Sequence, residues 1–249
     1  MGRYLNVTTK GFQESIQSEI YVDKTGMIAL LNRMIDTEQK YVCVSRPRRF
    51  GKSMAIKMLS AYYNSEADSS KMFRNMEIGS ESTCEAYRNR YEVVLVNMQE
   101  FYSSNINMDL MIRKINEGIC HELRKKYPTV EYTDIRSVVD TMYDIFLSED
   151  RTFIILIDEW DCIFREPGCK EDDWRKYLNF LRDWMKDKPY ISLAYMTGIL
   201  PVKKYGNHSA LNMFTEYSMT NPKRMGEYMG FTSDEVEKLC ARYQMNFED

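Results

Sequence analysis

Residue types that bind phosphate are concentrated in one short segment, Arg46-Pro-Arg-Arg-Phe-Gly-Lys-Ser53. Its last three residues complete the phosphate-loop pattern GxxxxGK[ST]. In that pattern, backbone N–H groups at a helix start bind phosphate, the lysine neutralises phosphate charge and the hydroxyl ligates Mg²⁺. Here Arg46 replaces the first glycine of the pattern. The match is therefore partial, and a nucleotide site requires a second, independent motif.

That second motif is acidic and follows the most apolar segment of the chain. Residues 152–157 read Thr-Phe-Ile-Ile-Leu-Ile and lead into Asp158-Glu159-Trp160-Asp161. An apolar strand ending in two carboxylates is typical of a Walker B element, in which Asp158 would hold Mg²⁺ and Glu159 would orient and deprotonate water. Many α/β strands end in an acid, so this signal alone is weak. Combined with the GKS turn, it predicts a nucleotide site.

The residues around these motifs predict the elements that position them. An apolar run predicts a strand over 41–45, and apolar residues at i, i+3, i+4 and i+7 after Ser53 predict the helix that the loop opens. Further β-branched runs predict strands at 92–97, 152–157 and 190–196, and a weaker one at 214–219. Helical spacing predicts helices near 27–35, 108–123, 135–146 and 174–185. This alternation favours a mostly parallel sheet with helices on both faces.

The remaining segments carry weaker signals. Residues 1–20 are polar and are expected to form an irregular surface lead-in, and residues 64–90 to form a loop with a short helix. Thr232-Ser-Asp-Glu235 is a capping box, which predicts a helix with Val236, Leu239, Cys240 and Tyr243 on one side.

Composition excludes several classes of protein. The chain has 249 residues and a net charge of −3, so no global basic field attracts nucleic acid or a membrane. Six scattered cysteines and two histidines give no zinc-like spacing. No apolar run reaches the roughly 18 residues of a membrane span. We therefore expect a cytoplasmic protein with reduced cysteines and no membrane partner.

Several motifs together resemble those of the bacterial AAA-ATPase-like family, whose members often carry a PD-(D/E)xK nuclease-like domain after the ATPase. In chain order they are Tyr21-Val-Asp-Lys-Thr25, Ser45-Arg-Pro-Arg-Arg-Phe-Gly-Lys-Ser53, Leu156-Ile-Asp-Glu-Trp-Asp161, Thr197-Gly-Ile-Leu-Pro201 and Gly230-Phe-Thr232. The resemblance runs from about Tyr21 to the C-terminus. Arg46 is normal in that family's loop.

The resemblance implies an α/β fold, a P-loop NTPase core of the ASCE/AAA type. Its five-stranded sheet would have the order 5-1-4-3-2. The core would span residues 21–229, and residues 230–249 would begin a helical lid, with the C-terminal nuclease-like domain absent. It also implies that Thr197, at the end of the fourth strand, senses the γ-phosphate or the water. No arginine stands at the start of the last helix, where a lid sensor would be; Arg242 is the nearest.

Together these inferences predict a site for ATP and Mg²⁺. The predicted catalytic residues are Glu159, Lys52 and Thr197, and the predicted metal ligands are Ser53 and Asp158. The predicted nucleotide contacts are Arg46, Pro47, Arg48, Arg49, Phe50, Gly51, Lys52, Ser53 and Met54. The function expected is ATP binding with Mg-dependent hydrolysis.

Alternatives stay open at several positions. Arg48 and Arg49 would clamp phosphate, pair with acids near Asp158 or be solvated. Asp161 would support the metal or cap a helix, and Trp160 would pack in the core. Lys203, Lys204 and Arg224 are candidates for a finger acting in trans on a second copy, although surface charge is the better explanation of each.

Two other functional classes also remain open, besides transfer of phosphate to a small molecule. The domain would be a nucleotide-dependent switch without significant turnover, or the motor of a nuclease-linked machine. In the second case, it would meet nucleic acid only through the absent C-terminal domain.

Overall fold

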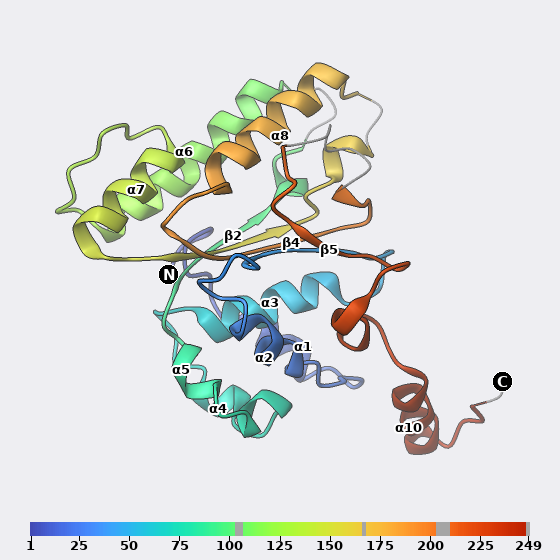
Figure 1. The fold of residues 1–249 in the computed structure, drawn as a ribbon. Coiled ribbons are helices and arrows are strands. Elements are labelled where there is room, and N and C mark those ends of the chain that lie inside the picture. Colours follow the sequence, from blue (N-terminus) through green and yellow to red (C-terminus); the bar gives the residue numbers. More distant parts are fainter. Residues whose placement is uncertain (103–106, 166–167, 203–209, 248–249) are drawn as a thin grey trace.

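The computed structural model describes residues 1–102, 107–165, 168–202 and 210–247, and a five-stranded parallel sheet runs through it (Figure 1). The strand order is β2-β3-β4-β1-β5, and every neighbouring pair is parallel. The strands are β1 (Tyr41–Ser45), β2 (Glu92–Asn97), β3 (Phe153–Asp158), β4 (Ile191–Gly198) and β5 (Thr215–Tyr217). Read from its other edge, this is the predicted order 5-1-4-3-2, and the predicted α/β P-loop fold is confirmed.

Helices cover both faces of the sheet, as predicted. Figure 1 shows α6 (Met108–Lys126), α7 (Val138–Glu149) and α8 (Glu171–Met185) on one face, and α1 (Lys10–Ile16), α2 (Gly26–Asn32) and α3 (Lys52–Tyr63) on the other. Because successive strand residues point to opposite faces, Ile155 and Ile157 pack towards the first layer, while Ile154 and Leu156 pack towards the second. Covering both faces explains why all residues of β1, β3 and β4 are buried.

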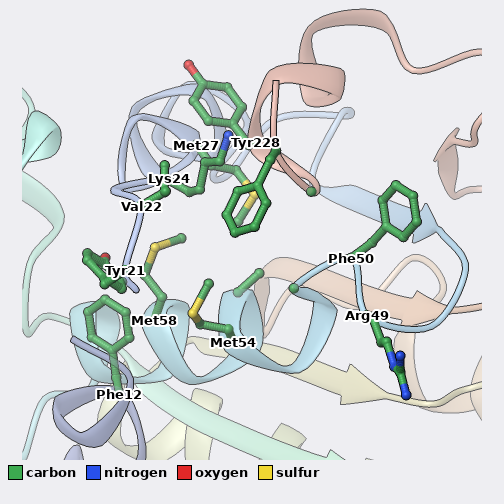
Figure 2. A pocket seen from close by; sticks show the side chains of 14 residues that line it. Phe12, Tyr21, Val22, Lys24, Met27, Arg49, Phe50, Met54, Met58 and Tyr228 are labelled. Carbon is green, nitrogen blue, oxygen red and sulfur yellow. The ribbon is translucent and has the colours of Figure 1, made fainter. Parts of the chain in front are cut away.

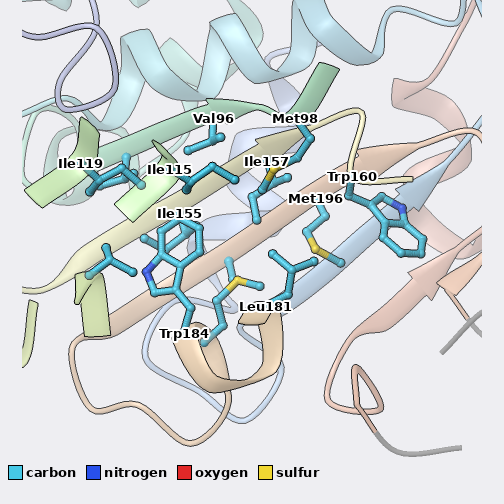
Figure 3. Close-up of a cluster of buried hydrophobic side chains, with 14 of the residues drawn as sticks. Val96, Met98, Ile115, Ile119, Ile155, Ile157, Trp160, Leu181, Trp184 and Met196 are labelled. Atoms are coloured by element: carbon cyan, nitrogen blue, oxygen red, sulfur yellow. The ribbon is translucent and has the colours of Figure 1, made fainter. Parts of the chain in front are cut away.

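The larger of the two cores lies between the sheet and α6, α7 and α8 (Figure 3). Ile115 and Ile119 of α6 belong to this core together with Leu181 and Trp184 of α8, and all four side chains are fully buried. Trp160 belongs to this core, which confirms that it is a packing residue.

Short elements connect these layers. They are α4 (Ser70–Phe73), η1 (Glu77–Ser80), α5 (Cys84–Tyr87), η2 (Met98–Glu100), η3 (Cys162–Phe164) and η4 (Lys223–Tyr228). The first three lie within the segment expected to be a loop with one short helix. Phe73, Ile78 and Cys84 bury their side chains under α2 and α3, so the segment is more ordered than its polar composition indicates.

The expectation for the first twenty residues is wrong in its local detail. The segment contains α1, and Leu5 and Phe12 are buried. Leu5 also forms an antiparallel bridge with Val94 of β2. A few apolar side chains fix the segment, and they are spaced too irregularly to register as a periodic pattern. Likewise α7 begins at Val138, after the Ser137 cap, so Ile135 lies before the helix and is 49% exposed.

The last helix, α10 (Ser233–Tyr243), lies apart from the sheet in Figure 1. Its capping box is confirmed: the Thr232 side chain accepts from the Glu235 N–H, and the Thr232 N–H donates to the Glu235 carboxylate. None of the residues in α10 is buried. Among the described residues, no helix is both long and apolar enough to cross a membrane.

Candidate functional site

The predicted site residues gather at one edge of the sheet because the strands are parallel and their carboxyl ends coincide. Val44 of β1 is in register with Thr197 of β4, and Ile157 of β3 with Met196. The loop after β1, Asp158 at the end of β3 and Thr197 near the end of β4 therefore meet. We call this group, with the start of α3 and residues 159–161, the phosphate end.

The loop after β1 leads into α3 through two residues in the left-handed region, Arg49 (φ 70°) and Gly51 (φ 77°). Gly51 is the N-cap of α3, and no side chain caps the helix there. Within the part of the chain that the structure describes, no side chain accepts a hydrogen bond from the N–H groups of the first turn of α3. Such a helix start, with its positive dipole end, is suited to an anion.

Lys52 is only 5% exposed, and its Nζ donates to the carbonyl of Pro47 at 2.9 Å. Burial lowers the pKa of Lys52, and the nearby charges of Glu159, Asp158 and Asp161 oppose that effect. An ammonium group at a helix start also opposes the helix dipole. Both unfavourable terms would be relieved by a bound anion, which fits the predicted role of Lys52.

The other predicted loop contacts differ in exposure. The guanidinium of Arg46 is buried and donates to the carbonyls of Ser45 at 3.0 Å and Tyr217 at 2.9 Å, so it faces β1 and β5. Ser53 is exposed on the first turn of α3. Pro47, Arg48 and Arg49 are exposed, and Phe50, Gly51 and Met54 are half-buried.

Asp158 is held by its neighbours at the end of β3. Its Oδ1 accepts a hydrogen bond of 2.6 Å from the Thr197 hydroxyl and one of 3.0 Å from the Glu159 N–H. Within the described ranges both bonds go to Oδ1, which leaves Oδ2 for a further ligand. The Thr197 side chain is fully buried, so in this arrangement it orients the carboxylate of Asp158.

Glu159 stands in the left-handed region (φ 53°), and its carboxylate forms an ion pair with Arg165. Arg165 also lies 3.3 Å from Asp161. Asp161 in turn accepts the N–H groups of Ile199 at 3.0 Å and Leu200 at 2.7 Å. Asp161 thus fastens the chain after β4. It also occupies the N-cap position of η3, one of its expected alternatives, although its side chain makes no cap hydrogen bond there. Sequence reasoning missed Arg165, which has no motif of its own.

Gly198 lies where these groups approach most closely. A Cβ atom built there would stand 2.6 Å from both Asp161 Oδ1 and Trp160 Nε1. The tight packing explains the glycine in Thr197-Gly198, because a larger residue would displace the acidic turn after β3.

A cavity of about 400 Å³ opens beside the loop, along the side of α3 (Figure 2). Its walls are mainly apolar and come from three segments far apart in the sequence. Residues that line it include Phe12, Tyr21, Met27, Met54, Met58 and Tyr228. We call this cavity the base end. Among the lining residues, those predicted as nucleotide contacts are Arg49, Phe50, Gly51 and Met54. The motifs Tyr21–Thr25 and Gly230–Thr232, to which sequence reasoning gave no role, supply further parts of the wall.

Of the three finger candidates, Arg224 alone lies within the described residues. Arg224 lies in η4 and is exposed. Lys203 and Lys204 lie outside the described residues.

One family model and several solved structures are similar to this chain. The family model described as "Predicted AAA-ATPase" matches residues 6–206. No curated protein matches the chain. Among solved structures, the Aeropyrum pernix ORC1 protein in complex with DNA has a TM-score of 0.47 and 11% identity, over 97% of this chain and 54% of that one. Cdc6p from Pyrobaculum aerophilum has a TM-score of 0.43 and 10% identity, over 96% of this chain and 53% of that one. The chain thus spans about half the length of these structures.

Proposed function

The chain belongs to the predicted AAA-ATPase family, and from this premise we propose that it binds ATP with Mg²⁺ and hydrolyses the nucleotide. One observation carries the proposal. A buried lysine at an uncapped helix start lies within electrostatic range of Asp158 and Glu159 at the carboxyl edge of a parallel sheet. Ligands of open α/β sheets bind at this edge.

The phosphate groups would lie against the first turn of α3. Its N–H groups and those of the loop would donate to phosphate oxygens, and Lys52 would exchange the Pro47 carbonyl for a phosphate oxygen. Arg48 and Arg49 are exposed and stay candidates for further phosphate contacts. Arg46 would contribute its backbone to the loop, because its guanidinium is bound to two strand carbonyls.

The residues present also fit a magnesium ion, which would neutralise charge on the β- and γ-phosphates. Hydroxyl and carboxylate oxygens are ligands that Mg²⁺ prefers, and Ser53 and the Oδ2 atom of Asp158 would supply them. The hydrogen bond from Thr197 to Oδ1 would hold Asp158 in place for this task. Thr197 would therefore act through the carboxylate, besides any contact with phosphate.

Glu159 would orient the attacking water and accept its proton. It directly follows Asp158, so its carboxylate starts from the same strand end as the metal ligand. A base in this position favours hydrolysis over transfer to another acceptor. The base end suits the nucleobase, because its aromatic and methionine side chains offer flat apolar contacts.

The test compares Lys52→Ala with Lys57→Ala, a lysine on the exposed side of the same helix. Losing a charge-assisted contact to phosphate costs roughly 2–3 kcal/mol, so calorimetry should show ATP affinity falling about 30- to 150-fold for Lys52→Ala. Lys57→Ala should bind as the wild type does. Equal affinity of the two variants would refute the phosphate site.

A slow nucleotide-dependent switch is a second candidate, favoured by the Glu159–Arg165 pair. A carboxylate held by a guanidinium must leave it before it can act on water, so turnover would wait for a partner that breaks the pair. Arg165→Gln should then raise the steady-state rate about two- to fivefold. Arg175→Gln, at a pair that is mostly solvent-exposed, should not change the rate. A lower rate in Arg165→Gln would instead make Arg165 a residue that supports catalysis.

The motor of a nuclease-linked machine makes a separate prediction, that DNA stimulates turnover. Measuring ATP hydrolysis with and without DNA distinguishes it from the other two functions.

A further inference from the structure

The motifs Tyr21–Thr25 and Gly230–Thr232 meet at the outer wall of the base end, although about two hundred residues separate them. Lys24 contributes to the wall from the first motif. Gly230 and Phe231 contribute from the second motif, and Tyr228 contributes from the segment just before it. In Figure 2, Lys24 and Tyr228 lie side by side above Met54 and Met58. We call residues 228–235 the strap.

The strap is attached to the loop at Gly230. The Gly230 N–H donates to the carbonyl of Phe50 at 3.2 Å. Gly230 has φ +80°, and a Cβ there would stand 2.9 Å from the Phe50 ring. The strap therefore lies directly on the residue that precedes the GKS turn, and glycine is required for that close approach.

A second attachment joins the strap to Lys24. Lys24 Nζ lies 2.6 Å and 2.7 Å from the two carboxylate oxygens of Glu235, and it also donates to the carbonyl of Glu227 at 2.6 Å. The lysine side chain is 10% exposed and that of Glu235 22%. These three acceptors match the three protons of an ammonium group.

The same carboxylate also begins α10. Its Oε2 accepts the N–H of Thr232 at 2.8 Å in the capping box. Glu235 therefore couples the start of the last helix to a lysine in the core. Otherwise α10 is weakly held within the described residues. None of its side chains is buried, and the Tyr243 hydroxyl donates to the Glu19 carbonyl at an exposed position.

We propose that the strap is a clasp on the nucleotide site, in which the Lys24–Glu235 ion pair sets how fast bound nucleotide leaves. This inference rests on the proposed function. Tyr228 and Phe231 wall the cavity on the outside, so a nucleobase between them and α3 would leave only when the strap lifts. Lifting the strap breaks the ion pair and the Gly230–Phe50 hydrogen bond, and leaves the hydrogen bonds of Lys52 and Asp158 in place.

The clasp makes a kinetic prediction that separates it from the phosphate end. Removing the ion pair should speed dissociation, because breaking a partly buried pair acts mainly on the off-rate. The release rate should change far more than the rate of hydrolysis in a single turnover, because among the described residues neither Lys24 nor Glu235 is hydrogen-bonded or ion-paired to the residues proposed for chemistry.

The experiment displaces ATP carrying a fluorophore on its ribose with excess unlabelled ATP, in stopped flow. Lys24→Met and Glu235→Gln should each raise the dissociation rate about tenfold. The controls are Lys238→Met and Glu237→Gln, on exposed positions of α10, and they should release at the wild-type rate. Thermal melting of each variant establishes that it is folded.

The double variant tests whether the two residues act through one ion pair. If both residues act through one ion pair, combining Lys24→Met with Glu235→Gln should give the rate of either single variant, not the product of the two effects. The clasp would be overturned if the double variant showed the product of the two single effects on the dissociation rate. It would also be overturned if the folded single variants released ATP at the wild-type rate. If Lys52→Ala weakens ATP binding as expected while the clasp variants release ATP at the wild-type rate, the clasp alone is wrong. If Lys52→Ala binds normally, the proposed function itself is wrong.

Discussion

The phosphate end and the base end of the proposed nucleotide site are built in opposite ways. The phosphate end consists of polar groups at strand ends, each held by its neighbours, as Thr197 holds Asp158 at 2.6 Å. The base end consists of aromatic and methionine side chains from three distant segments, with a wall attached through Gly230 and Lys24. One end is fixed by the sheet, whereas the other depends on a strap.

This difference separates two properties of the site. Charge and hydrogen bonding at the phosphate end would set whether nucleotide binds and reacts, because they act on the phosphates and the water. Apolar contact at the base end would add affinity and set the residence time. Substitutions at the two ends should therefore change different measurements.

The largest effect is expected at Glu159. Glu159→Gln keeps the shape of the side chain but removes the base, so turnover should fall about 100-fold or more. ATP affinity by calorimetry should stay within about twofold, because binding depends on Lys52 and the loop. Equal turnover in wild type and variant would show that another group activates the water.

Gly198→Ala tests how rigid the phosphate end is. The new Cβ would stand 2.6 Å from Asp161 and Trp160, so the free energy of unfolding should drop by about 1–3 kcal/mol. Gly11→Ala is the control, because the atom nearest to its Cβ would belong to the flexible Lys57 side chain, at an ordinary contact distance of 3.4 Å. Urea denaturation measures both. A stable Gly198→Ala protein would mean that the acidic turn adapts easily.

A smaller effect is expected at the base end. Tyr228→Ala removes one wall of the cavity, and ATP affinity should weaken about three- to tenfold. Hydrolysis in a single turnover should be unchanged, in contrast to Glu159→Gln. Tyr143→Ala, at a partly exposed tyrosine of α7, serves as the control. A selective loss of hydrolysis in Tyr228→Ala would show that the two ends are coupled.

The smallest effect concerns pH. Burial alone would raise the pKa of Glu235, but hydrogen bonds from Lys24 and Thr232 hold the pKa below its ordinary value. A carboxyl group whose pKa is lower in the folded than in the unfolded protein stabilises the fold at pH values above its unfolded-state pKa, about 4.3. That contribution is lost as the pH falls through the folded-state pKa. The Glu235 side chain is partly exposed, so solvent screening keeps the contribution at about 1 kcal/mol or less.

Unfolding in urea at neutral pH and near pH 3 measures this contribution. The free energy of unfolding of the wild type should exceed that of Glu235→Gln at neutral pH. The difference between the two proteins should disappear near pH 3. A difference in the free energy of unfolding that grows in acid would contradict a lowered pKa of Glu235.

The sequence predicted the sheet and the phosphate end because both depend on contiguous signals. β1 and the GKS turn are adjacent in the chain, and β3 runs straight into Asp158, so each motif carries its own element. Parallel pairing then brings the strand ends together without further information.

Other features had no such local signal. The base end needs Phe12, Met54 and Tyr228 to converge, and no short pattern encodes that meeting. The sequence also did not predict that the Arg46 guanidinium is buried, because an arginine in a basic loop is expected to face solvent or phosphate. α1 escaped detection because it buries a single side chain, Phe12.

The contact of Arg46 with Tyr217 has a consequence for how related sequences vary. β5 has three residues and pairs only with β1 among the described strands, so this guanidinium ties a short edge strand to the rest of the sheet. A relative with glycine at this position, as the general loop pattern has, would lose that tie. We therefore expect position 46 and the fifth strand to covary: arginine with a short strand, and glycine with a longer or otherwise anchored one.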